Sequence, residues 1–179
     1  MGQRMSKPLW LIRAGEDERK FVEFIRESVA SVGFTEIGPL AEGVAEAEVR
    51  QIARKEITKA PRWYRGATSV FRFLSEVAID DEVVTYTSKD AEGVPARSFV
   101  LGRITGSYQW REDRLHEHPR HRAAVWTQVA SKDALSEESN WEIGKSGNRF
   151  VSVRLLSDST ADDLRHCARP LEDEDSGDL

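Results

Sequence analysis

Three histidines fall within six residues of one another, at His116, His118 and His121. Imidazole nitrogens are common zinc ligands, so this segment is the first candidate for a metal centre and for metal-dependent catalysis. Four arginines surround it in the sequence: Arg111, Arg114, Arg120 and Arg122. No cysteine lies nearby, and a solvated basic loop explains this composition more simply than a metal site does. We therefore expect no metal ligand and no cofactor, with a metal-dependent enzyme as the alternative.

Nucleophilic and nucleotide-hydrolysing chemistry finds no support in the sequence. There is no GxSxG elbow, and no cysteine is paired with a histidine in a local signature that would activate a nucleophile. The apolar run Leu9–Ile12 is followed by neither GxGxxG nor GxxxxGK[ST], the glycine-rich patterns that cradle phosphates. Acidic clusters at 80–82 and 137–138 are typical of solvated turns in so charged a chain. We expect a protein without catalytic residues.

Aromatic residues offer a stronger signal, because five tryptophans occur in 179 residues. Trp10 belongs to an apolar run and is expected in the core. Five other aromatics stand in polar segments that contain glycine or arginine: Trp63, Tyr64, Tyr108, Trp110 and Trp141. Aromatic faces beside guanidinium groups suit base stacking combined with phosphate contacts. For each residue the alternative is a loop folded over a small apolar cluster, but their occurrence in several segments favours nucleic-acid binding.

The start of the chain supplies the elements that could position such a site. Leu9–Ile12 is typical of a strand buried on both faces. Apolar residues then recur at spacings of three and four, which predicts a helix over 17–31 that Gly33 caps. A strand, a turn through 13–15 and a helix would place free backbone N–H groups beside the turn. An anion or the edge of a ligand could bind there.

The remaining pattern predicts two further helices and several strands. Helices are expected over 46–59 and 69–78, where apolar residues follow a helical period. Strands are expected at 82–87, 98–105, 122–130 and 149–155. Irregular segments are expected at 34–40, 62–66, 108–121 and 140–148. Because the strands are mostly consecutive and the helices come early, we expect an α+β fold. Its sheet should be a curved or closed antiparallel barrel with about three flanking helices.

Charge and composition bound the organisation of the chain. The formal net charge is -5, but residues 158–179 carry eight acidic side chains against two arginines, which leaves +1 for residues 1–157. We predict a leader at 1–7, one domain at 8–157 and an acidic tail or linker at 158–179. No segment could span a bilayer, no basic and apolar leader precedes Pro8, and the single Cys167 fits a reducing compartment. A cytoplasmic location is therefore expected.

The order of several motifs resembles that of a known family. The motifs are WLIRAG at 10–15, VGF at 32–34 with IG at 37–38, VFRF at 70–73, DEVVTY at 81–86, LGRITGSY at 101–108, HP at 118–119 and RAAVW at 122–126. Together they resemble the N-terminal domain of Mrr-type methyl-directed (type IV) restriction proteins. That domain is similar to members of the PUA-like superfamily, which includes the EVE and YTH domains. The resemblance covers roughly residues 8–156.

The resemblance implies a small PUA-like β-barrel that accepts a flipped-out modified base in an aromatic pocket. One wall would be the turn after the first strand: Arg13, Ala14, Gly15 and Glu16. The opposite wall would be Phe34 with Thr35, and the second aromatic would be Tyr108 or Trp110. Trp63 and Trp141 complete the candidate pocket residues.

A base reader also needs contacts to the nucleic-acid backbone, which make binding dependent on salt. The candidates are Arg65, Arg72, Arg103, Arg111, Arg114, Arg120 and Lys145. The implied partners are DNA that carries a modified, methylated base, and a nuclease in another domain or subunit of a modification-dependent restriction system. RNA is the alternative ligand, as in many PUA-like domains. No membrane partner is expected.

Overall fold

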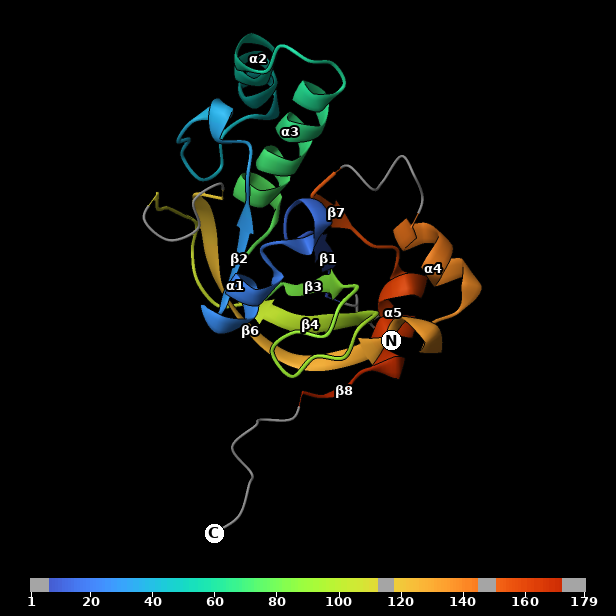
Figure 1. Ribbon diagram of the computed structural model, residues 1–179. Coiled ribbons are helices and arrows are strands. Elements are labelled where there is room, and N and C mark those ends of the chain that lie inside the picture. Colours follow the sequence, from blue (N-terminus) through green and yellow to red (C-terminus); the bar gives the residue numbers. More distant parts are fainter. Residues whose placement is uncertain (1–6, 113–117, 145–150, 172–179) are drawn as a thin grey trace, which may run out of the picture.

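A curved β-sheet forms the centre of the molecule (Figure 1). The structure is a computed structural model, and it describes residues 7–112, 118–144 and 151–171. Within these residues the strand order is β2-β6-β4-β3-β1-β7, and β5 and β8 each pair with β6. The strands are β1 (Leu9–Ile12), β2 (Val29–Val32), β3 (Glu82–Thr87), β4 (Ser98–Ile104), β5 (Gln109–Trp110), β6 (Arg120–Ser131), β7 (Val153–Leu155) and β8 (Arg169–Pro170). The sheet is curved as expected, but β2 and β7 stand at opposite ends of this order, so the described strands do not close into a barrel.

Pairing in the sheet is mixed. The antiparallel pairing expected between 82–87 and 98–105 is confirmed, because β3 and β4 are antiparallel neighbours. The strand β1, however, pairs in parallel with β3, with Leu9 opposite Glu82. Parallel neighbours need a long crossover connection. Here the connection from β1 to β3 contains β2 and three α-helices. The expectation of a purely antiparallel sheet was therefore wrong at the β1–β3 pair.

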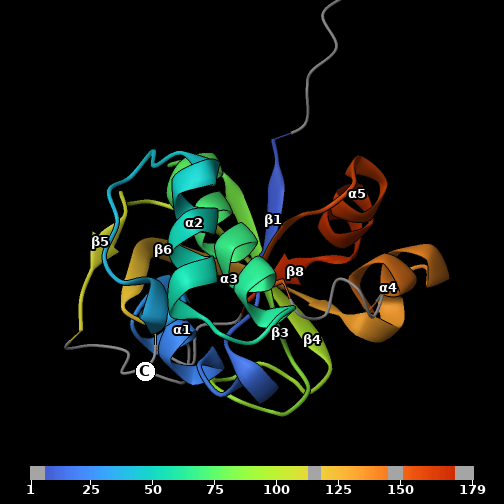
Figure 2. The ribbon, with the colours of Figure 1, turned by 90° about the horizontal axis from the view of Figure 1, so that it is seen from above.

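Five α-helices pack around the sheet in the part of the chain that the structure describes (Figure 2). They are α1 (Phe21–Arg26), α2 (Glu46–Glu56), α3 (Arg62–Phe71), α4 (Glu137–Gly144) and α5 (Asp158–Cys167). A π-helical turn, η3 (Arg72–Glu76), continues α3, and short 3₁₀ turns occupy η1 (Glu16–Glu18), η2 (Thr35–Ile37) and η4 (Lys132–Ala134). Only three helices were expected, because α4 has a weak apolar period and the acidic side chains of α5 suggested a tail. None of the described helices is long and apolar enough to cross a membrane.

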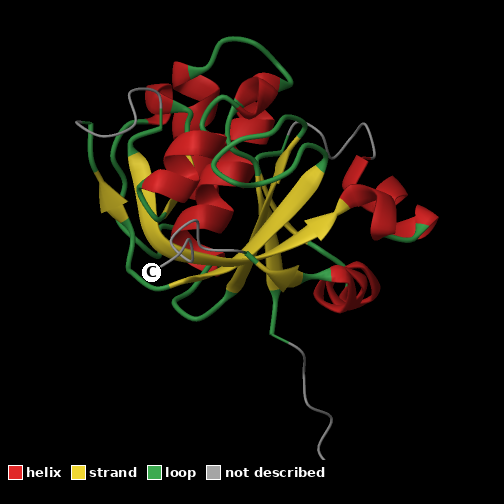
Figure 3. Ribbon diagram, turned by 60° about the horizontal axis from the view of Figure 1, so that its bottom comes forward, coloured by secondary structure: helices red, strands yellow, loops and turns green. Residues whose placement is uncertain are grey.

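Helices cover both faces of the sheet (Figure 3), and alternate residues of β1, β3 and β4 belong to the two cores. Trp10 and Ile12 of β1 face a core shared with α1, α2 and α3. Leu9 and Leu11 face a second core shared with α4 and α5. A strand with both faces covered reads as an unbroken apolar run. This explains why Leu9–Ile12 was correctly identified as a doubly buried strand.

The helix expected over 17–31 is confirmed only over Phe21–Arg26, because residues 17 and 18 lie in a 3₁₀ turn and residues 29–32 form a strand. α1 ends at Arg26, Ser28 has a φ of 50°, and β2 follows as a strand antiparallel to β6. All four residues of β2 are buried, so their apolar character fits a helix and a buried strand equally well. Pairing with β6 decides the outcome. Gly33 consequently follows a strand and does not cap a helix.

Two segments expected to be irregular are helical. The segment 62–66 begins α3, directly after Pro61. Gly66 lies inside this helix and packs against the Phe34 ring. A Cβ at position 66 would come within 2.8 Å of that ring, so glycine is what allows this close approach. The glycine therefore reflects close packing between distant segments rather than a turn. In the segment 140–148, residues up to Gly144 belong to α4, and residues 145–150 lie outside the described part of the chain.

The acidic segment from residue 158 is folded up to residue 171, which corrects its assignment as a tail or linker. Ser157 caps α5 by accepting a hydrogen bond from the backbone N–H of Thr160 at 3.3 Å. Ala161 and Leu164 then pack against the second core. After the helix, β8 pairs with β6. The acidic side chains of α5 lie on its solvent side, which masked a short amphipathic helix in the sequence.

Candidate functional site

A cavity of about 850 Å³ lies where the end of β1 meets the end of β2 and the helix α3. Its lining includes the expected pocket residues Arg13, Ala14, Gly15, Glu16, Phe34 and Thr35, together with the expected phosphate contact Arg65. The fold thus brings together the two segments that the family resemblance assigned to one site. A second cavity, of about 510 Å³, borders the same turn through residues 16–19.

The turn after β1 has an uncommon backbone conformation. Gly15, Asp17 and Glu18 have φ values of 81°, 52° and 58°. Left-handed backbone costs roughly 1 kcal/mol for a residue with a Cβ, so neighbouring contacts must hold this turn. The Glu18 carboxylate supplies such contacts, accepting hydrogen bonds from the N–H and the hydroxyl of Ser88 at 3.0 and 2.6 Å. The turn is thereby fixed as one rim of the cavity, and η1 separates it from α1.

Phe34 forms the opposite wall. Its φ of 60° is rare for an aromatic residue. Its ring packs against α3 at Gly66, and the guanidinium carbon of Arg62 lies 5.6 Å from the ring centroid. Arg62 also forms an ion pair with Glu36. The ring is therefore fixed between α3 and the cavity on a strained backbone, a combination that is common at binding sites.

Arg120 holds this wall from inside the protein. Its side chain is completely buried and donates hydrogen bonds to the carbonyls of Gly33 at 2.6 Å, Phe34 at 3.1 Å and Gly38. Its guanidinium carbon also lies 4.9 Å from the ring centroid of Trp110. Burial lowers the pKa of Arg120 to about 10, so the group remains charged at neutral pH. A phosphate cannot reach a buried side chain, so the expected phosphate contact at Arg120 was wrong.

His118 also lines the cavity, although the sequence did not identify it as a pocket residue. It is 8% exposed, and a Cβ on Gly15 would lie 3.4 Å from its ring. Its Nδ1 lies 3.1 Å from the buried Ser31 hydroxyl. Burial, together with the nearby charges of Lys20 and Arg19, lowers the pKa of His118 to about 4. The imidazole is therefore neutral at physiological pH. In the sequence it is visible only as one of three clustered histidines.

The lowered pKa of His118 should make the free energy of unfolding depend on pH. The unfolded chain protonates this imidazole near 6.5, whereas the folded protein takes up the proton only near 4. The unfolded state binds more protons between these values, so stability should fall as pH drops from about 6.5 towards about 4, by at most about 3 kcal/mol. Urea denaturation of the wild type and of His118→Gln over this range measures the difference. Parallel curves for the two proteins would contradict the assignment.

Four expected pocket aromatics lie outside the cavity lining. Trp63 is on α3, half-buried, with the guanidinium carbon of Arg54 at 4.7 Å from its ring centroid. Tyr108 packs against the main core, and burial raises its pKa. The Trp110 ring lies against the guanidinium group of the buried Arg120. Trp141 on α4 is 64% exposed. The aromatic neighbourhood of the cavity is therefore smaller than expected.

The cavity lining contains an aromatic residue besides Phe34, namely Tyr86 of β3. The sequence did not indicate Tyr86 as a pocket residue. Its ring lies 5.0 Å from that of Phe99, measured between centroids. The ammonium group of Lys132 lies 5.5 Å from the Tyr86 centroid. Side chains alternate between the two faces of β3, so the strand pattern could have indicated that Tyr86 lines the cavity. This inference requires the pairing of β3 with β1, which the sequence did not show.

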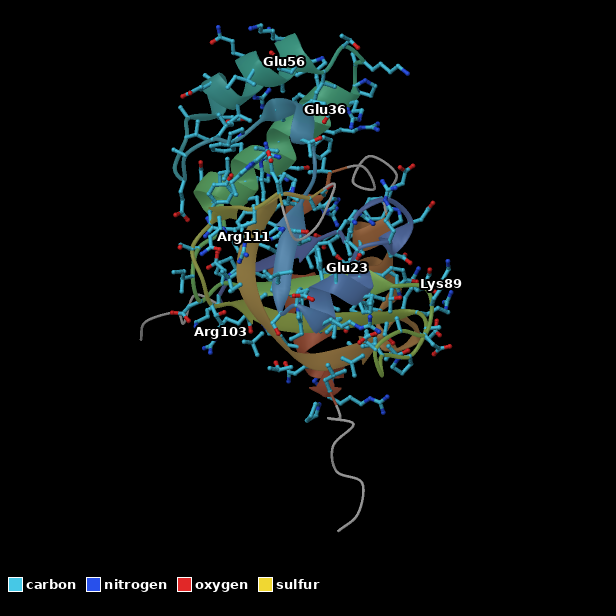
Figure 4. The ribbon with its side chains drawn as sticks, turned by 60° about the vertical axis from the view of Figure 1, so that its left-hand side comes forward. Glu23, Glu36, Glu56, Lys89, Arg103 and Arg111 are labelled. Atoms are coloured by element: carbon cyan, nitrogen blue, oxygen red, sulfur yellow. The ribbon has the colours of Figure 1, made fainter. Side chains whose placement is uncertain are left out.

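The expected phosphate contacts occupy several faces. Arg65 lines the cavity. Arg72 donates a hydrogen bond to the carbonyl of Val153 at 3.1 Å and so serves packing. Figure 4 shows Arg103 and Arg111 on the sheet, with Arg103 far from the end of α2 that Glu56 marks. Arg114 and Lys145 lie outside the described residues.

The densest positive charge beside the cavity lies on the hairpin of α2 and α3. The segment 50–65 contains one acidic side chain, Glu56, and six basic ones: Arg50, Arg54, Lys55, Lys59, Arg62 and Arg65. Arg62 and Arg65 line the cavity, whereas Arg54 and Lys59 are exposed on the hairpin. The sequence showed this charge run, but its position beside residues 13–16 and 33–36 required the fold.

The described residues hold no arrangement typical of metal binding. No three His, Cys, Asp or Glu side chains among them could hold a metal ion, and His116 lies outside this part of the chain. Ser31 and His118 are hydrogen-bonded, but Ser31 is completely buried and no substrate can reach its hydroxyl. In the acidic cluster 80–82, Asp81 accepts a hydrogen bond from the indole N–H of Trp10 at 3.0 Å, which is a structural role.

These features define an α+β protein with a curved mixed sheet, helices on both faces and a polar cavity beside its first strand. The chain belongs to the family described as Domain of unknown function (DUF8426), whose model matches residues 10–144. No curated protein and no solved structure matches the chain. The family match includes the two cavity walls, the hairpin and His118.

Proposed function

We propose that this chain is a non-catalytic, PUA-like module that recognises a modified DNA base flipped into the cavity beside Phe34. The observation that carries the proposal is the cavity, which joins the turn 13–16 to residues 34 and 35. These are the segments that the resemblance to Mrr-type domains assigns to a base pocket. In this proposal the module works in the cytoplasm. It supplies the specificity of a modification-dependent restriction system whose nuclease is another domain or subunit.

The energetics of base flipping are compatible with this cavity. Its volume of about 850 Å³ falls within the range of pockets that take small ligands. Removing a base from its stack costs a few kcal/mol, and an aromatic face returns roughly 1 to 3 kcal/mol per stacked base. Hydrogen bonds from the polar lining to the edge of the base supply the remainder. A methyl group on the base adds a small apolar term.

The basic hairpin is the proposed binding surface for the nucleic-acid backbone. Removing two of its exposed charges, in Arg54→Gln with Lys59→Gln, should weaken binding to modified and unmodified duplexes alike. The plot of log K against log salt has a negative slope, and each phosphate that is no longer neutralised reduces the magnitude of this slope by about 0.9. The slope of the double variant should therefore be less steep by about 1.8. Anisotropy titrations between about 50 and 200 mM salt give this slope.

A matched control removes two exposed charges elsewhere. Lys89 and Arg103 are exposed, and Figure 4 shows both away from the end of α2 that Glu56 marks. Arg103 was predicted from the sequence as a phosphate contact, but the proposed binding surface is the hairpin, so the double variant Lys89→Gln with Arg103→Gln should keep the wild-type slope. An equal decrease of the slope in both double variants would mean that net charge, and not the hairpin, governs binding.

The direct test is an affinity panel with the whole chain. Matched duplexes carrying 5-methylcytosine, 5-hydroxymethylcytosine, N6-methyladenine or phosphorothioate are compared with unmodified DNA at low salt. A preference for one duplex with a modified base supports the proposal, whereas a preference for phosphorothioate, which modifies the backbone, or binding to no duplex at all overturns it. Competition with a matched RNA shows whether RNA is the better ligand.

A further inference from the structure

Ser31 fixes which nitrogen of His118 carries the proton. The Ser31 side chain is completely buried, and within the described residues its hydroxyl has one hydrogen-bond partner, Nδ1 of His118 at 3.1 Å. The Ser31 backbone also forms a hydrogen bond that favours the protonated imidazole. In the neutral imidazole, however, a buried hydroxyl whose proton finds no acceptor is costly, so we infer that Ser31 donates to Nδ1. The neutral imidazole must then carry its proton on Nε2. Its second nitrogen is therefore a hydrogen-bond donor.

This donor is available to a ligand. His118 lines the cavity, and within the described residues the partner of its ring is Ser31, whose hydroxyl contacts Nδ1 and whose backbone lies near the imidazole. Nε2 lies beside Gly15, and a Cβ at position 15 would lie 3.4 Å from it. Because glycine has no side chain, Nε2 remains accessible from the cavity. Glu16 follows directly and also lines the cavity, which adds a carboxylate acceptor to the same wall.

We propose that His118 reads the flipped base by donating its Nε2–H to an acceptor atom on the base edge, while Glu16 accepts from an exocyclic amine. The proposal rests on the proposed function and names its substrate class: derivatives of cytosine, adenine or guanine, which carry an acceptor beside an exocyclic amine. Thymine and uracil derivatives have no such amine. His118 is then a specificity residue, with Ser31 positioning its proton.

Affinity measurements on His118 variants test this role. His118→Phe keeps a flat ring but has no donor, and it should weaken binding to the preferred modified duplex about tenfold, as expected when one hydrogen bond is removed. His118→Gln keeps an N–H donor and should retain most of the affinity. Binding to unmodified DNA should not change. A duplex carrying 5-hydroxymethyluracil should bind no better than unmodified DNA.

The pH dependence of binding provides a second readout. The charged and titratable groups around His118 are Lys20, Arg19, His121 and the rim carboxylate Glu16. Because the neutral imidazole already carries the donor, affinity should be flat between about pH 5.5 and pH 8 in the wild type and in His118→Gln. An affinity that rises on acidification in the wild type alone would show an imidazolium bound to an anion, and would overturn the assignment.

A ligand-free measurement keeps the proposal testable if a variant fails to fold. Nitrogen-15 NMR of the free wild-type protein should show a protonated Nε2 and an unprotonated Nδ1 for His118, and Ser31→Ala should mix the two tautomers. The opposite tautomer in the wild type would overturn the assignment. Failure of the wild type to bind any duplex would instead overturn the proposed function, and the assignment with it. Full affinity in a folded His118→Phe would remove only His118 from recognition.

Discussion

Phe34→Ala should lose most of the preference for a modified base while nonspecific binding to DNA stays nearly unchanged. The ring lines the cavity and is fixed against Gly66, so it presents a preorganised face to a flipped base. Stacking contributes roughly 1 to 3 kcal/mol per base, which corresponds to a decrease of about 5- to 150-fold in affinity for the modified duplex. Fluorescence anisotropy with matched modified and unmodified duplexes at low salt measures both quantities.

Two control variants separate stacking from other effects of this change. Trp141→Ala removes an exposed aromatic outside the cavity lining and should leave the preference intact. Phe34→Leu keeps apolar packing against α3 but offers no flat face, so it should behave like alanine in binding and retain more of the thermal stability. If Phe34→Ala folds and keeps the full preference, Phe34 is not part of the base pocket.

The second large effect is expected at Arg120, whose replacement should destabilise the fold as well as the site. Arg120→Met retains much of the side-chain volume but leaves the carbonyls of Gly33, Phe34 and Gly38 without their donor. Hydrogen bonds from a charged group contribute about 1.5 to 3 kcal/mol each, and removing the buried charge offsets part of the loss. We expect a net decrease of about 3 kcal/mol in the free energy of unfolding, measured by urea denaturation.

Arg103→Met is the matched control for this change, because it removes an exposed arginine on β4. Its ion pair with Asp80, at 3.8 Å, is exposed, so stability should change by no more than about 0.5 kcal/mol. Arg120→Lys keeps the charge but not the two-armed geometry and should fall between the two. Equal stability of Arg120→Met and the wild type would show that Arg120 does not hold the Phe34 segment.

Local patterns were sufficient where a segment has one dominant period and its neighbours do not compete. Leu9–Ile12, the helix at 46–56 and the β3–β4 pair all follow from such patterns, and all are confirmed. The error at Val29–Val32 arose because four buried residues carry no periodicity of their own, so pairing with β6 decided their conformation. α5 was missed because its buried stripe is narrow and its other face is acidic.

By itself, the sequence determined the α+β class and the buried first strand, and the family resemblance pointed to two segments, 13–16 and 34–35, that line the cavity. Only the tertiary structure decided what surrounds them. Arg120 is a basic residue in a basic segment, yet burial makes it a support for the Phe34 segment rather than a phosphate contact. His118 joins the cavity because β6 pairs with β2 beside Ser31. Residue type limits the chemistry of a side chain, but its burial and its partners depend on contacts between segments distant in the chain, which no local pattern encodes.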